Sequence, residues 1–245
     1  MSRQGRLLAL AGALLTLMAP LTHANGLNLS WDACGTAGSA NKQFACNTNV
    51  GVDELVLSTR FSTAGVYSYP LAATATLDIV TGQDILPSWW RASGTAACRP
   101  GAIQATWTDE GPQCAAIFGL PPLSVSWAPS GASPERRRLT IHCPSWGGLE
   151  YDDPGVEYYV CTVLLSHAKS VGPGSCGGCG VPACLVFNSL EVFSDLTPNL
   201  RMAYITNPLD RNFVTWQGGT TGMPICPAAT PARNRTWGSL KSLYR

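Results

Sequence analysis

Short runs in which apolar and polar residues alternate recur along most of the chain. In 102–107, the apolar residues Ile103, Ala105 and Trp107 alternate with polar ones, and 73–79 alternates in the same way. Residues spaced two apart share one face of a β-strand, so this period predicts strands with one buried face. The expected strands are 52–58, 71–80, 102–108, 123–127, 138–143, 156–166, 184–193, 201–206 and 212–216.

Turn-forming residues separate these runs. The chain contains 25 Gly and 18 Pro, and no long stretch has the 3.6-residue period of an amphipathic helix. Period-two runs with frequent turns favour antiparallel sheets. We therefore expect an all-β fold: a single antiparallel β-sandwich, immunoglobulin-like or jelly-roll-like, with several disulfides over 25–219. An irregular Pro/Thr-rich segment and a C-terminal tail follow over 220–245.

The first 24 residues are typical of a secretory signal peptide. Arg3 and Arg6 precede the apolar run 7–18, and Thr22 and Ala24 place small side chains at positions −3 and −1 of a cleavage site. An uncleaved N-terminal anchor is the alternative. No later stretch reaches the length of a membrane helix. We therefore expect a secreted, cell-surface or periplasmic protein with no membrane span in the mature chain.

Charge excludes one class of partner. Charged residues make up 13% of the chain, and the formal net charge is +1. A nucleic-acid binder carries an excess of Lys and Arg that neutralises phosphates. We therefore expect no nucleic-acid partner.

The cysteines agree with export. An even number of cysteines in an exported chain predicts a disulfide framework. All ten follow the predicted cleavage site: Cys34, Cys46, Cys98, Cys114, Cys143, Cys161, Cys176, Cys179, Cys184 and Cys226. Local spacing suggests Cys34 with Cys46, Cys98 with Cys114, Cys143 with Cys161 across two strands, and the last four among themselves.

The motif Cys176-Gly-Gly-Cys179 has two further interpretations. With Cys184 and Cys226 it is able to supply four thiolates to zinc, and Cys-x2-Cys also occurs in thioredoxin-like redox sites. Zinc requires reduced thiolates, a second Cys-x2-Cys is missing, and no βαβ pattern surrounds the motif. Structural disulfides are therefore favoured, and we expect no metal and no cofactor.

The C-terminal tail TWGSLKSLYR resembles a Thr-Trp-Gly-x-x-Lys-x-Leu-Tyr-Arg ending found on exported bacterial proteins. The segments GLNLSWDACGTAG, CGGCGVPACLVFNSLEV and ITNPLDRNFVTWQGG resemble parts of one family of secreted, cysteine-rich bacterial β proteins. The resemblance implies a bacterial, exported, cysteine-bridged protein. It implies no activity and no catalytic residue.

Candidate catalytic residues are few. The mature chain has two histidines, His142 and His167, both in or at the end of expected strands, and it lacks a Gly-x-Ser-x-Gly motif. Asp152 and Asp153 lie in the acidic turn 150–157. Their carboxylates suit calcium or a two-carboxylate glycosidase. The Asp-Asp-Pro-Gly sequence favours a solvated hairpin turn instead.

Eight tryptophans are the residues most suggestive of binding. Trp89 and Trp90 are adjacent, so in an extended chain one ring is buried and the other faces outward. Trp146 and Trp216 are further candidates for contact with a glycan or an envelope protein. Packing of these rings beneath loops is the alternative interpretation.

These observations favour an exported, noncatalytic extracellular or envelope module with a binding or structural role, and no enzyme. A carbohydrate-binding module that uses exposed tryptophans is the first alternative. A secreted hydrolase that uses the acidic turn is the second.

Overall fold

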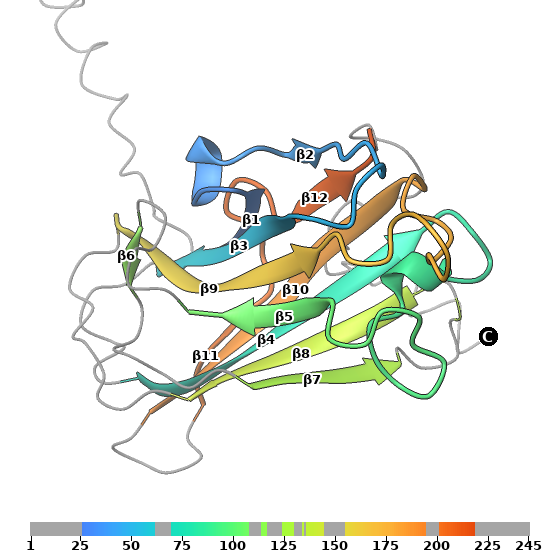
Figure 1. Ribbon diagram of the computed structural model, residues 1–245. Helices are drawn as coiled ribbons and strands as arrows, with labels where there is room; N and C mark the ends of the chain where they lie inside the picture. The colour runs from blue at the N-terminus through green and yellow to red at the C-terminus, as the bar shows by residue number, and fades with distance from the viewer. Residues whose placement is uncertain are drawn as a thin grey trace, which may run out of the picture.

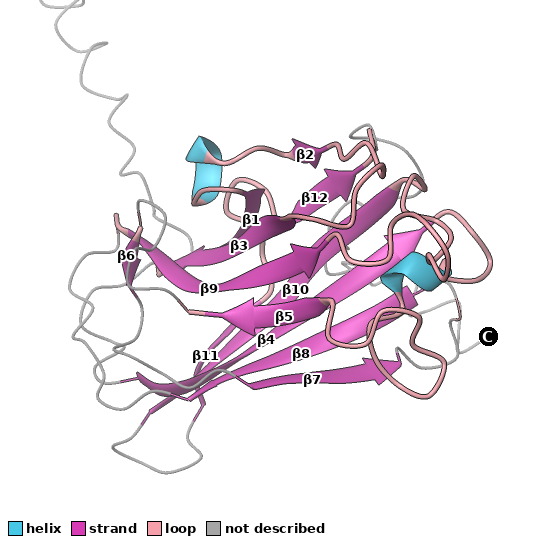
Figure 2. Ribbon diagram, viewed as in Figure 1, coloured by secondary structure: helices cyan, strands magenta, loops and turns pink. Residues whose placement is uncertain are grey.

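The computed structural model describes residues 26–61, 70–107, 114–116, 124–129, 134, 136–144, 155–194 and 201–218. Within them the chain forms two β-sheets that pack face to face (Figure 1). Their helical turns are two short 3₁₀ segments, η2 (Gly35–Ala37) and η3 (Ser88–Trp90) (Figure 2). The predicted all-β sandwich is therefore confirmed. No helix in the described ranges is long and apolar enough to cross a membrane.

The smaller sheet is the nearer layer in Figure 1. Its strands run in the order β1–β3–β9–β5, and β6 pairs with β9. All of these pairings are antiparallel except the short β6–β9 pair. The strands are β1 (Gly26–Trp31), β3 (Val52–Arg60), β5 (Ile103–Thr106), β6 (Ala115–Ala116) and β9 (Glu157–Ser166).

The larger sheet lies behind the smaller one. Its order is β2–β12–β10–β4–β8–β7, with β11 also paired to β10. The central strands β4 and β10 pair over almost their whole length. The strands are β2 (Asn41–Lys42), β4 (Pro70–Thr81), β7 (Ser124–Pro129), β8 (Arg136–Pro144), β10 (Ala183–Ser194), β11 (Arg201–Ile205) and β12 (Phe213–Trp216).

The core fills the space between the two sheets. On β4, the residues Ala73, Ala75, Leu77 and Ile79 are buried and belong to this core, as the alternation predicts. Their pairing with β10 and β8 places one apolar face of the larger sheet against the smaller sheet. The register is fixed by this burial, because a one-residue slip would turn the apolar face to solvent.

All nine expected strands are present, and none of their ends is shifted by more than two residues. The structure adds β1, β2 and β6. Strand β1 has no alternation of burial, because both of its faces are covered. Its polar side chains are satisfied: Asn28 donates to Glu157 and accepts from the backbone N–H groups of Asp210 and Arg211.

Candidate functional site

Three loops meet at one end of the sandwich. The loop 43–51 leads into β3, the loop 82–102 joins β4 to β5, and the loop 167–182 joins β9 to β10. Strand order brings these loops together, because β4, β9 and β12 all end at this side and β3, β5 and β10 begin there (Figure 1). We call the three loops together the clamped end.

Two disulfides tie the clamped end together. Cys46 is bridged to Cys179, and Cys98 is bridged to Cys176. Both flanking loops are therefore held by the Cys-Gly-Gly-Cys motif of the loop 167–182. Each bridge joins residues far apart in sequence, with separations of 133 and 78 residues.

Of the disulfide pairs expected from local spacing, Cys34 with Cys46 and Cys98 with Cys114 are wrong, and Cys176 and Cys179 do not pair among the last four cysteines. Besides the two bridges of the clamped end, Cys34 is bridged to Cys114. The nearest cysteines in sequence do not pair: Cys34 is bridged to Cys114, next to β6, whereas Cys46 lies in the loop before β3 and is bridged to the loop between β9 and β10. Cys184 is disulfide-bonded as well, and Cys226 lies outside the described residues.

Cys143 and Cys161 are both free and buried, which corrects the expected cross-strand bridge between them. Cys143 lies on β8 and Cys161 on β9, so they belong to different sheets and both line the core. A hydrogen bond with Cys143, together with burial, raises the pKa of the Cys161 thiol well above its usual value. The Cys161 thiol therefore resists ionisation while the protein is folded, and burial keeps reagents away from both sulfur atoms.

The sulfur atoms of the Cys-Gly-Gly-Cys motif are committed to two different bridges. Cys176 and Cys179 therefore supply no thiolate to zinc and form no redox disulfide with each other. Among the residues that the structure describes, no group of three or more His, Cys, Asp or Glu side chains is placed to hold a metal ion.

An aromatic cluster lies beneath the clamped end. Trp89, Trp90 and Trp216 are fully buried, with the rings of Trp89 and Trp216 stacked at 5.1 Å and Trp90 edge-on to both. The expectation that one of the adjacent rings faces outward is wrong, because they lie in the 3₁₀ turn η3 and not in an extended strand. None of these three rings offers a face to a ligand.

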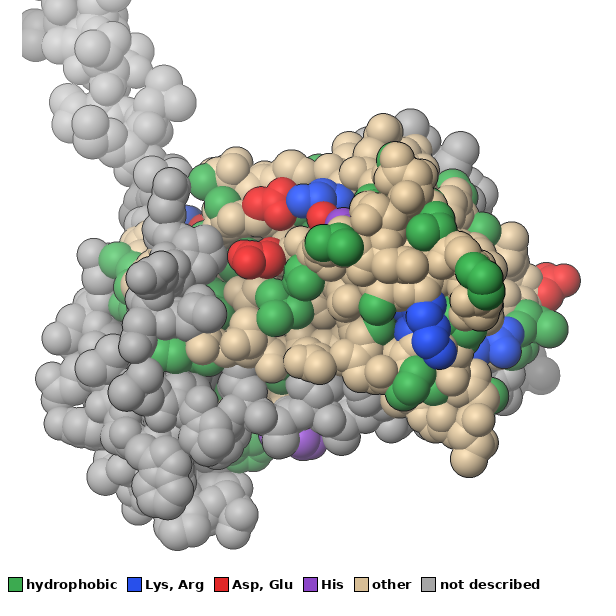
Figure 3. Space-filling view, in the orientation of Figure 1, with side chains coloured by type: hydrophobic (Ala, Val, Ile, Leu, Met, Phe, Trp, Pro, Cys, Tyr) green, Lys and Arg blue, Asp and Glu red, His purple; other side chains and the backbone are tan. Residues whose placement is uncertain are grey.

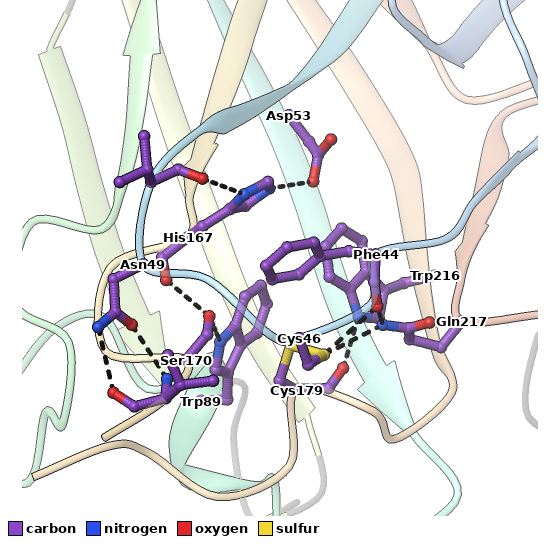
Figure 4. Close-up of a disulfide and its surroundings, with 12 residues drawn as sticks. Phe44, Cys46, Asn49, Asp53, Trp89, His167, Ser170, Cys179, Trp216 and Gln217 are labelled. Atoms are coloured by element: carbon purple, nitrogen blue, oxygen red, sulfur yellow. Dashed lines mark hydrogen bonds and ion pairs between the residues drawn. A yellow bond between two sulfur atoms is a disulfide. The ribbon is translucent and has the colours of Figure 1, made fainter. Parts of the chain in front are cut away.

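Hydrogen bonds connect this cluster to the loops above it (Figure 4). The indole N–H of Trp216 donates to the backbone carbonyl of Cys179 at 2.7 Å, and that of Trp89 donates to Ser170 Oγ at 3.0 Å. The Asn49 side chain pairs with both backbone groups of Val171 at 3.0 and 3.1 Å. Each loop is therefore fixed by polar contacts as well as by sulfur.

His167 is enclosed at the base of the same loops. Its Nε2 lies 2.7 Å from Asp53 Oδ2, its Nδ1 lies 3.1 Å from the carbonyl oxygen of Val50, and the Phe44 ring stacks on it at 3.7 Å. Figure 4 shows both ring nitrogens directed at these partners. A general base needs a nitrogen directed at the group it deprotonates, and here both are occupied by structural contacts.

Arg99 is the most unusual charged residue of the clamped end. It is 1% exposed, and its guanidinium carbon lies 3.6 Å from the centre of the Trp89 ring. Within the described part of the chain, none of its guanidinium nitrogens has a hydrogen-bond partner. Desolvation lowers its pKa to about 10. The cation–π contact offsets part of the cost of burying the charge.

The outer surface of the clamped end is partly apolar and partly basic. Val50 is 80% exposed and Ile85 is 61% exposed. Lys169 is exposed as well, and Arg91 is half-buried. Figure 3 shows hydrophobic and basic side chains next to one another over this end. These groups are available to a partner, whereas the tryptophans beneath them are not.

Several candidate residues fall outside the described ranges: Trp146, Asp152 and Asp153, together with the tail 220–245. His142, the other histidine of the predicted mature chain, lies on β8 with its Nδ1 3.2 Å from Thr74 Oγ1. It is not part of the clamped end. No protein-family model and no curated protein matches the chain.

Proposed function

We propose that this protein is an exported, noncatalytic module of the extracellular space or cell envelope, and that its clamped end binds an envelope protein. Its disulfides support the location, because such bonds form and persist in oxidising compartments. The apolar and basic surface over the clamped loops supports the binding role.

The rigid attachment of the three loops carries the proposal. Binding sites of β-sandwiches are commonly built from loops at one end. A loop that is already ordered loses little conformational entropy when a partner binds. Here two bridges and the Asn49–Val171 contacts order the loops in advance. Val50 and Ile85 lie on this ordered surface with their side chains exposed.

A protein partner is favoured over a glycan. Sugars are held against flat aromatic faces, and the candidate rings Trp89, Trp90 and Trp216 are buried. Exposed aliphatic side chains beside cations suit a protein surface with apolar and acidic residues. The enclosed geometry of His167 supports a binding role over a catalytic one.

Binding to isolated envelopes tests the proposal. Purified protein is added to envelopes of the organism that encodes it, and the bound fraction is measured against protein concentration. We expect saturable binding that weakens about tenfold or more in Ile85→Asp, because a buried aliphatic side chain contributes about 2 kcal/mol. Tyr204→Asp is the matched control, since Tyr204 is 53% exposed on β11, outside the clamped end.

Two results would overturn the proposal. The first is an absence of saturable binding by the unsubstituted protein. The second is an equal loss of affinity in Ile85→Asp and Tyr204→Asp. Cell fractionation tests export separately: the full chain is expected outside the cytoplasm with its bridges formed, and a chain without residues 2–24 is expected inside with its cysteines reduced.

A further inference from the structure

The outer face of the larger sheet carries an apolar patch at the edge nearest the clamped end. Cys184 on β10 pairs directly with Val80 on β4, and Val186 on β10 pairs with Phe213 on β12. Paired residues point to the same side of a sheet. Their neighbours Ile79 and Leu185 belong to the main core, so these four residues point away from it.

This outward-facing patch is nevertheless buried. Cys184 is 0% exposed, Val186 is 4% exposed and Val80 is 8% exposed. An outer face of a two-layer sandwich normally contacts water and carries polar residues. The smaller sheet covers the opposite face, and the described parts of the chain place no third layer of strands over this one. Among the described residues, the partly buried apolar side chain packed against these three is that of Phe213, which lies on the same face of the same sheet.

Cys184 indicates which further segment of the chain contacts this patch. It is disulfide-bonded, yet it is absent from the three bridges whose ends are both described. Cys143 and Cys161 are free. Of the ten cysteines in the sequence, only Cys226 remains as a partner within the chain.

We propose that the apolar patch is the docking site of residues 219–226, which a Cys184–Cys226 disulfide holds against β4, β10 and β12. The described chain ends at Gly218, just after β12, which itself pairs with the part of β10 that contains Cys184. Cys226 is the eighth residue after Gly218. Eight extended residues span about 26 Å. That length allows the chain to return from the end of β12 to Cys184 on the neighbouring strand β10.

The composition of the segment matches the patch. Residues 219–226 read GTTGMPIC and contain no charge. Met223 and Ile225 supply apolar side chains that suit contact with Val80 and Val186.

Forming the bridge removes two protons and two electrons from the thiols of Cys184 and Cys226. A second disulfide, which exchanges with these thiols, accepts the two protons and two electrons and is reduced to two thiols. Docking also fixes where the tail 227–245 leaves the domain.

Peptide mapping of unreduced, alkylated protein tests the bridge. We expect a linked pair of peptides that contain Cys184 and Cys226, recovered from monomeric protein. An alkylated Cys226 would overturn the proposal. So would a bridge between two chains, seen as a dimer that is lost on reduction.

Two truncations test docking independently of the bridge. In a Cys184→Ser background, removal of 219–245 should expose the patch and raise the fluorescence of a hydrophobic dye several-fold. Removal of 227–245 alone, with both cysteines kept, should leave dye binding unchanged. Equal dye binding by the two truncated proteins would overturn the proposal, as would an unchanged signal in both. Circular dichroism of each truncated protein shows whether the sandwich is still folded.

Discussion

Replacing Cys46 and Cys179 together with alanine should lower the free energy of unfolding by about 4 kcal/mol. A disulfide stabilises a fold largely by restricting the unfolded chain, and its effect grows with the logarithm of the loop it closes. The two residues are 133 apart, but the Cys98–Cys176 bridge lies inside that loop. The shortest covalent path also uses the Cys34–Cys114 bridge and is therefore about 31 residues, which corresponds to about 4 kcal/mol.

Urea unfolding followed by tryptophan fluorescence measures this change. Trp89, Trp90 and Trp216 lie beneath the bridge and are fully buried, so their emission reports on this region. Loss of about 4 kcal/mol should lower the melting temperature by about 10 °C in a domain of this size. The dependence of the unfolding free energy on urea should become steeper, because the unfolded chain expands without the bridge.

Replacing Cys143 and Cys161 with alanine is the matched control. It also removes two buried sulfur atoms, yet it breaks no covalent link. Packing is lost, so stability falls, but the urea dependence should not change. A loss below about 1 kcal/mol in the Cys46/Cys179 variant, with an unchanged urea dependence, would refute the reasoning that this bridge restricts the unfolded chain.

Three further predictions concern single residues. Gly178 has φ of +100°, and a Cβ there would collide with a proline ring, so Gly178→Ala should cost about 1–3 kcal/mol in urea unfolding. Gly180→Ala, where space is open, should cost below about 0.5 kcal/mol. Asp53→Asn should cost about 1–2 kcal/mol, because a buried acceptor loses its charge. The exposed Asp32→Asn should cost below about 0.5 kcal/mol in the same assay. The pKa of Arg99 is lowered to about 10 in the folded protein. The unfolded state therefore keeps this proton to higher pH, and the protein should gain stability relative to Arg99→Met as pH rises through about 10. Urea midpoints measured across that pH range check the sign.

Strands were predictable from the sequence wherever one face of the strand is buried and the other is exposed to solvent. Strand β4 alternates in the sequence, and from Ala73 to Leu77 every second residue is buried in the structure. Strand β1 was not predictable in this way, because both of its faces are covered. Asn28 and Ser30 are buried there beside leucines, and their partners come from distant segments that local pattern does not reveal.

The clamped end was less predictable than the strands. Local spacing favours bridges between neighbouring cysteines, whereas the observed bridges follow from the order of strands in the two sheets. The burial of Trp89 and Trp90 depends on a 3₁₀ turn that the residues alone did not indicate. The sequence Cys98-Arg99-Pro100 likewise has no pattern that marks Arg99 as a buried cation.

The oxidised state of the clamped end is tested most directly by disulfide mapping of purified, unreduced protein with mass spectrometry. We predict peptides that link Cys46 to Cys179 and Cys98 to Cys176. Cys143 and Cys161 should react with an alkylating reagent only after unfolding. Reaction of most cysteines without reductant would contradict this account, and so would a bridge between Cys176 and Cys179.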